Sequence, residues 1–211
     1  MNNNSAFTLA ETLITLVIIG VIAAITIPVI FENYRREEAS ARIKKFYSML
    51  QNASTRAKAD GKDWLDYAET ASSSSDASTE TIDSFAASYL YPYINYNKSE
   101  ITESTKHPYL YTYLNDGTYF SIHKGTCLHF VFDLNGTRKP NAHGRDKFDF
   151  LYCGSDVDYY YGGGAKLIPY MPASMNTREK ALSYCKSTPS SCVGLLLFDG
   201  WKFKKDYPYS I

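Results

Sequence analysis

The sequence predicts an α+β protein in which one long N-terminal helix packs on an antiparallel sheet. Three observations support this prediction. Residues 7–31 form an almost continuous apolar run, and about 20 such residues cross a bilayer as one helix. Residues 32–60 then carry apolar side chains at steps of three and four, the period of an amphipathic helix. From residue 109 the apolar period becomes two, which is typical of strands.

One carboxylate interrupts the apolar run near its beginning. Glu11 lies one helical turn after Phe7, and an ionised side chain inside a membrane segment costs roughly 2.5–3.5 kcal/mol even on lenient insertion scales. Glu11 is therefore a candidate functional residue. The alternative interpretation is that Glu11 lies at the membrane interface and caps the start of a helix.

The segment AFTLAE at residues 6–11, followed by the apolar run, resembles the N-terminal signature of type IV prepilins and type II secretion pseudopilins. In that family a membrane peptidase cuts before the Phe and methylates the new amino terminus. The resemblance implies cleavage between Ala6 and Phe7, with residues 1–6 as a leader peptide. It also implies a pilin-like fold, in which the membrane half of the helix (7–31) is followed by a half that packs on the head.

Gly20 and Pro28 match positions where the family tolerates helix breakers, so a filament of such helices can stretch or bend there. Two features depart from the family pattern: Ala6 stands where Gly is usual, and the leader has no Lys or Arg. Arg35 and Arg36 follow the run, and by the positive-inside rule they place the downstream domain in the cytoplasm. The signature and the cysteines predict the opposite side, and we adopt that orientation.

Cleavage before Phe7 leaves an ammonium about one turn from Glu11. A pair between these groups on neighbouring copies neutralises both in lipid and fixes the register of packed helices, whereas an unpaired charge there is strongly unfavourable. The resemblance thus implies a structural filament subunit in the inner (cytoplasmic) membrane, not an enzyme. Its implied partners are other copies, related pilins, the prepilin peptidase, a membrane platform and an assembly ATPase. The sequence does not distinguish a subunit of a secretion pseudopilus from a subunit of a surface pilus.

A singly anchored extracytoplasmic binding or adhesion protein is the alternative. In that interpretation the polar segment at 70–81 and the glycines at 162–164 are contact sites. A cleaved signal peptide fits less well, because the first residues lack a basic side chain and the apolar run exceeds 7–15 residues. The 22 basic and 22 acidic side chains balance, so no nucleic-acid binding is predicted.

The rest of the chain supplies a head domain over residues 61–211. Asp60-Gly61 ends the long helix, although two helices broken near Pro28 and Asn33 are an alternative. Residues 82–90 have helical spacing. The remaining predicted elements are a hairpin at 109–114 and 118–123, strands at 126–133, 148–152 and 193–198, and a helix opened by a capping box at Asn176 to Glu179.

The loop from Asp133 to Asp146 contains oxygen side chains at alternate positions followed by Gly, as at the start of a calcium loop. Asp133, Asn135 and Asp146 are its candidate ligands. The dense acidic spacing of a calcium-binding EF-hand is missing, and the same residues suffice for turns. A Ca²⁺ site and a purely structural loop both remain open, and no other cofactor is predicted.

The four cysteines are even in number, which favours disulfides in an exported domain. Of three possible pairings we favour Cys185–Cys192 together with Cys127–Cys153. His129 lies two residues from Cys127, so the two share one side of a strand. This placement predicts a contact on the sheet face rather than a Cys–His nucleophile pair.

Overall fold

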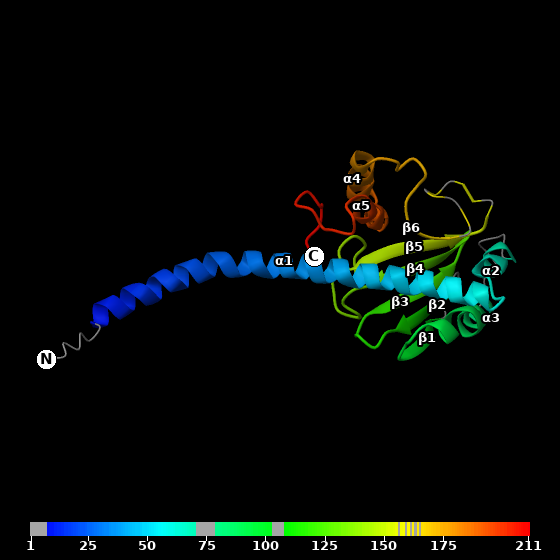
Figure 1. Cartoon of the computed structure of the whole chain (residues 1–211), viewed down its shortest axis with the longest axis horizontal. Helices are drawn as coiled ribbons and strands as arrows, with labels where there is room; N and C mark the ends of the chain where they lie inside the picture. The colour runs from blue at the N-terminus through cyan, green and yellow to red at the C-terminus, as the bar shows by residue number, and fades with distance from the viewer. Residues whose placement is uncertain are drawn as a thin grey trace.

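The computed structural model describes residues 8–70, 79–102 and 108–211, apart from residues 156, 159, 161, 163 and 165. Its longest element is α1 (Leu9–Ala59), an uninterrupted helix of 51 residues. This confirms one helix of about fifty residues, without a break at Pro28. The first half of α1 projects from the head, and the second half lies across the sheet (Figure 1).

The second half of α1 packs because its apolar side chains share one stripe. The helix ends at Ala59, and just beyond it Gly61 adopts a φ of +74°, a backbone conformation that favours glycine. The buried residues of α1 are those of the predicted stripe: Ala39, Ile43, Phe46, Leu50, Ala53 and Ala57.

Short helical segments connect α1 to the sheet. They are α2 (Trp64–Thr70), α3 (Thr79–Phe85), the π-helical turn η1 (Ala86–Leu90) and the 3₁₀ turn η2 (Tyr91–Tyr93). The helix predicted over 82–90 is confirmed by α3 and η1, whereas α2 was not predicted. Most of the polar segment at 70–81 lies outside the described residues.

In the described part of the chain, six strands form one antiparallel meander in chain order. The hairpin predicted at 109–123 and the strands predicted at 126–133 and 148–152 are confirmed, and a strand is added at each edge. The strands are β1 (Lys98–Thr102), β2 (Tyr109–Tyr113), β3 (Tyr119–Lys124), β4 (Cys127–Asp133), β5 (Lys147–Cys153) and β6 (Leu167–Pro169).

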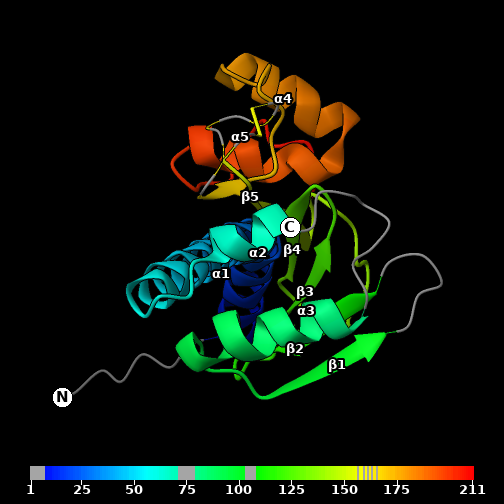
Figure 2. The same cartoon turned by 90° about the vertical axis from the view of Figure 1, so that its right-hand side faces the viewer.

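Phe46 anchors α1 to the middle of the sheet. Its ring stacks on Phe132 of β4, with centroids 4.3 Å apart, and contacts Phe120 of β3 and Phe150 of β5 at 5.2 and 5.5 Å. Seen along α1, the helix crosses one face of the sheet, with α3 near the β1–β2 edge and α5 on the opposite side of α1 (Figure 2). The main core lies between this face and the helices.

The C-terminal region differs from the sequence prediction. The strand predicted at 193–198 is wrong, because these residues form α5 (Cys192–Phe198), which follows α4 (Arg178–Ser187) and the 3₁₀ turn η3 (Pro189–Ser191). A short apolar run that is buried on all sides has no period that separates strand from helix. The cap of α4 is Thr177, whose side chain accepts from the N–H of Lys180, one position after the predicted Asn176.

Candidate functional site

Thr8 and Glu11 close the start of α1 with a reciprocal capping box. The backbone N–H and the hydroxyl of Thr8 donate to Glu11 Oε2 at 2.8 and 3.0 Å, and the N–H of Glu11 donates to Thr8 Oγ1 at 3.3 Å. The carboxylate is therefore held at the positive end of the helix dipole. The capping contact is present in the uncleaved single chain, and the predicted cleavage site at Ala6 and Phe7 lies outside the described residues.

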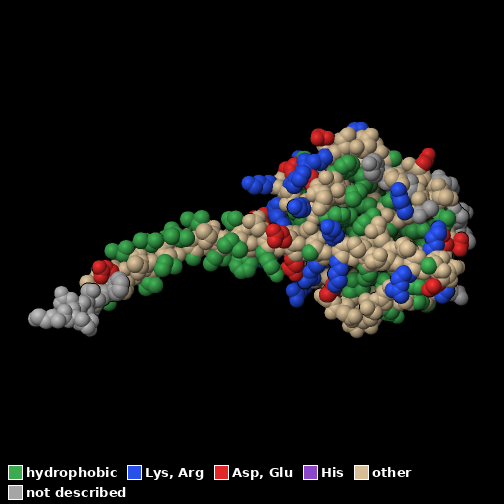
Figure 3. Space-filling view, in the orientation of Figure 1, with side chains coloured by type: hydrophobic (Ala, Val, Ile, Leu, Met, Phe, Trp, Pro, Cys, Tyr) green, Lys and Arg blue, Asp and Glu red, His purple; other side chains and the backbone are tan. Residues whose placement is uncertain are grey.

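The first half of α1 has almost no contacts with the head. Its most apolar 18-residue window has a mean hydropathy of 2.9 and is 0 % buried. Large apolar side chains along it are from 49 % (Ile27) to 81 % (Leu9) exposed. Figure 3 shows apolar side chains along both visible edges of the projecting helix. In water such a surface is unfavourable, so it requires lipid or other apolar partners.

Polar groups along this half are satisfied within the helix. The hydroxyls of Thr12, Thr15 and Thr26 donate at 2.9 Å to the backbone oxygens of Leu9, Thr12 and Ile22. Backbone and side-chain donors in lipid need such internal partners, because no water is there to replace them. The segment is therefore compatible with a bilayer both in its length and in the internal hydrogen bonds of its polar side chains.

Gly20 and Pro28 both lie inside the unbroken helix. A Cβ added at Gly20 meets no atom within 4 Å, so no packing within the chain requires glycine there. Pro28 has no N–H and removes one helical hydrogen bond. The first half of α1 curves away from the line of the second half (Figure 1).

The cysteines form the pairing that the sequence analysis favoured. Cys127 and Cys153 face each other across β4 and β5, with a Cα–Cα distance of 4.3 Å. Cys185 and Cys192 join the end of α4 to the start of α5. Because Cys127 is oxidised, it has no thiolate for a Cys–His nucleophile pair.

His129 instead belongs to a stack of rings on the outer face of the sheet. Its ring lies 4.5 Å from that of His123, centroid to centroid. Burial, with a smaller contribution from the charge of Lys124, lowers the pKa of His129 to about 4. The neutral form of the side chain therefore predominates at pH 7.

The loop after β4 is held by hydrogen bonds among its own residues. Asp133 Oδ1 accepts from the N–H of Asn135 at 3.1 Å. The Asp146 carboxylate accepts from the backbone N–H groups of Asn141 and Ala142 at 2.8 and 2.6 Å, and from Asn135 Nδ2 at 2.9 Å. This geometry fits the structural interpretation of the loop, and calcium binding stays a prediction. Across the described ranges, no group of three His, Cys, Asp or Glu side chains could hold a metal ion.

An ion-pair cluster at the C-terminal region was not found from the sequence. Arg178 at the start of α4 pairs with Asp199 at 2.6 Å and with Asp206 at 2.8 Å, and Lys204 pairs with Asp199 at 2.7 Å. Asp199 has a side chain only 1 % exposed, so the two cations compensate a buried charge. Arg178 and Asp199 are separated by α4, η3 and α5, so no local sequence pattern brings them together.

A long apolar N-terminal helix joined to a helix-backed antiparallel head defines a pilin-like membrane protein. Residues 1–27 match the model of the prokaryotic N-terminal methylation motif, which marks a type IV pilin-like precursor processed by prepilin peptidase. Residues 29–211 match the model of a family of unknown function, DUF6613, and the chain belongs to that family. No curated protein and no solved structure matches the chain.

Proposed function

We propose that this protein is a structural subunit of a type IV pilus-like or type II secretion pseudopilus filament, assembled through the first half of α1. The observation that carries the proposal is an apolar half-helix that the head leaves unburied, with a carboxylate at its tip. A simple anchor needs the apolar length alone. A neutral Gln at position 11 could close the same capping box without the roughly 2.5–3.5 kcal/mol that an ionised acid costs in lipid.

Processing changes what Glu11 faces. In the uncleaved chain its carboxylate accepts from the N–H and the hydroxyl of Thr8. Removal of residues 1–6 turns the nitrogen of Phe7 into an ammonium one residue before that cap. The ammonium and the carboxylate on one helix are then a donor and an acceptor for two different neighbours. Repetition of such a heterologous contact produces an open helical filament.

The head fits a structural role outside the cytoplasm. Two disulfides join its parts, and such bonds persist in oxidising compartments. The half-buried His129 is neutral and stacked, and the oxidised Cys127 is no nucleophile. Catalysis by these residues therefore has no support, and we assign the protein no reaction.

The test is assembly of the Glu11→Gln variant in the native host. Sheared surface filaments and membrane-extracted oligomers are quantified and compared with wild type. An unpaired ammonium in lipid costs about 3–5 kcal/mol, so assembled protein should fall more than about 100-fold while the membrane-bound monomer persists. The matched control is Glu37→Gln, which removes an exposed acid from the head-proximal part of α1.

The alternative, a singly anchored binding protein, is separated by the same experiment. Such a protein keeps its membrane level and its monomeric state whether residue 11 is Glu or Gln. Normal assembly of Glu11→Gln, or monomeric wild-type protein at native abundance, would contradict the filament proposal.

A further inference from the structure

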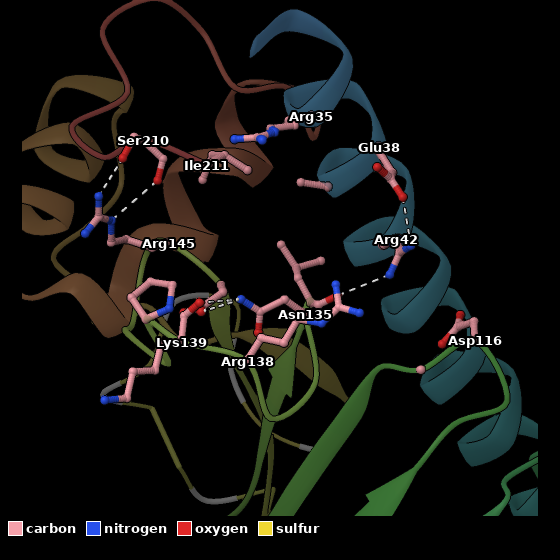
Figure 4. A pocket seen from close by; sticks show the side chains of 15 residues that line it. Arg35, Glu38, Arg42, Asp116, Asn135, Arg138, Lys139, Arg145, Ser210 and Ile211 are labelled. Carbon is pink, nitrogen blue, oxygen red and sulfur yellow. Dashed lines mark hydrogen bonds and ion pairs between the residues drawn. The ribbon is translucent and has the colours of Figure 1, made fainter. Parts of the chain in front are cut away.

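A pocket of about 840 Å³ lies at the end of the head from which the apolar half-helix emerges. One wall is the α1 segment that contains Arg35, Glu38 and Arg42, and the opposite wall is the loop after β4 with Arg138 and Lys139. Figure 4 shows an open space between Arg35 on α1 and Arg145 with Ser210 on the other side. The two walls meet where Arg42 Nη1 donates to the backbone oxygen of Leu134 at 3.1 Å.

The acids that line the pocket already have partners. Glu38 pairs with Arg42 at 2.7 Å, and Asp116 pairs with Lys45 at 2.8 Å. The Asp146 carboxylate accepts from three N–H groups of its own loop. The charge of each of the three acids is thus at least partly offset within the head.

Four cations that line the pocket, in contrast, have no carboxylate partner in the described part of the chain. Arg35, Arg138, Lys139 and Arg145 line the pocket, and none has an ion pair with a carboxylate in the described part of the chain. Among the residues that the structure describes, the guanidinium of Arg145 donates to Ser210 alone. Like charges gathered around one space repel, and an anion placed between them removes the repulsion.

The position of the pocket next to the apolar segment points to the membrane as a source of such an anion. Arg35 follows the last apolar residue, Phe31, by four residues, which is about 6 Å along a helix axis. Arg42 is about 16 Å from Phe31 by the same rise. The headgroup layer extends roughly 5–8 Å beyond the hydrocarbon on each side. One wall of the pocket therefore begins within the headgroup layer, and basic side chains gather at this end of the head (Figure 3).

We infer that the pocket binds the phosphate-bearing headgroup of an anionic phospholipid from the leaflet on the side of the head. Arginine side chains bind phosphate through paired N–H groups, and Lys139 adds a point charge. The bound lipid orients the head on the bilayer before assembly. The inference rests on membrane anchoring by α1 and is independent of the filament role.

The inference also accounts for the conflict over Arg35 and Arg36. The positive-inside rule places such residues in the cytoplasm, whereas the methylation motif and the disulfides place the head outside. In the structure Arg36 pairs with Glu32 at 2.7 Å and donates to the backbone oxygen of Lys204 at 3.0 Å. Arg35 faces the pocket (Figure 4). Arg36 thus contacts residues of the protein itself, and Arg35 is left to contact the lipid headgroup.

The test uses the full chain in lipid nanodiscs made from equal amounts of phosphatidylcholine and phosphatidylglycerol. The lipids that stay bound after mild detergent extraction are identified by native mass spectrometry. Wild type should retain phosphatidylglycerol in excess. The variant Arg35→Gln/Arg138→Gln/Lys139→Gln should reduce the excess by about fivefold or more, since each surface cation contributes a factor of that size.

The matched control is Lys44→Gln/Arg56→Gln/Lys186→Gln, which removes three exposed cations outside the pocket and should retain the excess. Added inorganic phosphate should not displace the lipid. Equal retention by wild type and the pocket variant, an equal loss in the control, or displacement by free phosphate would overturn the inference. Glu11→Gln should leave lipid retention unchanged, so a failure here is distinct from a failure of the filament proposal.

Discussion

The two halves of α1 belong to one continuous helix but have opposite surroundings. The second half buries Ile43, Phe46 and Leu50 against the sheet, each at most 2 % exposed, whereas Leu16 and Ile25 of the first half remain more than 60 % exposed. The second half finds its apolar partners within the chain. The first half finds none, so its partners are lipid and, in our proposal, other copies. The comparison separates what folds the protein from what assembles it.

The largest expected effect of a single substitution in the head is at Phe46. Replacing this ring by Ala leaves a cavity against Phe120, Phe132 and Phe150, and the free energy of unfolding should fall by about 3–5 kcal/mol. Both tryptophans of the chain lie in the head, so urea unfolding in detergent micelles can be followed by their fluorescence. Ile18→Ala in the exposed half is the control and should leave the transition unchanged. An equal loss of unfolding free energy in Phe46→Ala and Ile18→Ala would contradict the claim that only the second half of α1 stabilises the fold.

The two disulfides should rank by the length of chain that each closes. Cys127 and Cys153 are 26 residues apart, and Cys185 and Cys192 only 7. Loop-closure entropy predicts a loss of about 3.5 kcal/mol for Cys127→Ala/Cys153→Ala and about 2.5 kcal/mol for Cys185→Ala/Cys192→Ala. The same unfolding measurement checks the order. A reversed order would show that packing of α4 and α5 depends on its disulfide more than chain entropy requires.

Acid should loosen the head without affecting the apolar half. The folded pKa of His129 is about 4, below its ordinary value of 6.5. Its neutral form therefore stabilises the fold above pH 6.5, and that stability is lost as pH falls through 6.5 towards 4. His129→Gln should lose about 1–2 kcal/mol less than wild type over this range. Thermal unfolding at several pH values measures the difference, and identical pH profiles would contradict it.

The smallest expected effect is that of calcium. The Asp146 carboxylate already accepts three hydrogen bonds within its loop, and binding of an ion there would have to displace some of them. We therefore expect the same melting temperature in excess Ca²⁺ and in a chelator. A rise with Ca²⁺ that is absent in Asp146→Asn would establish the calcium interpretation instead.

Local periodicity accounts for the part of the fold that could be predicted. The apolar stripe of α1 and the alternation along β2 to β5 are signals carried by neighbouring residues, and these elements are confirmed. The edge strand β1 has mostly exposed side chains, and β6 has three residues, so neither has a pattern. In α5, Gly194 packs against Met171 and Met175, a tertiary contact that no local pattern predicts.

Of the candidate functional residues, too, only those with a local sequence signal could be predicted. Glu11 was found because one charge in an apolar run is conspicuous, and its capping contact with Thr8 is three residues away. The basic pocket was not found, because it combines α1 with a loop about one hundred residues later and with the C-terminal segment. Only the packing of α1 on the sheet brings Arg35 opposite Arg138.

The central claim is that the carboxylate of Glu11 meets the amino terminus of another copy. A lipid-soluble carbodiimide, which joins a carboxylate to a nearby amine, tests it in membranes of cells that contain light and ¹⁵N-labelled copies. The account predicts joined peptides that link Phe7 of one isotope to Glu11 of the other, and their absence in Glu11→Gln. Links confined to single copies, or a Met1 terminus without cleavage, would contradict it.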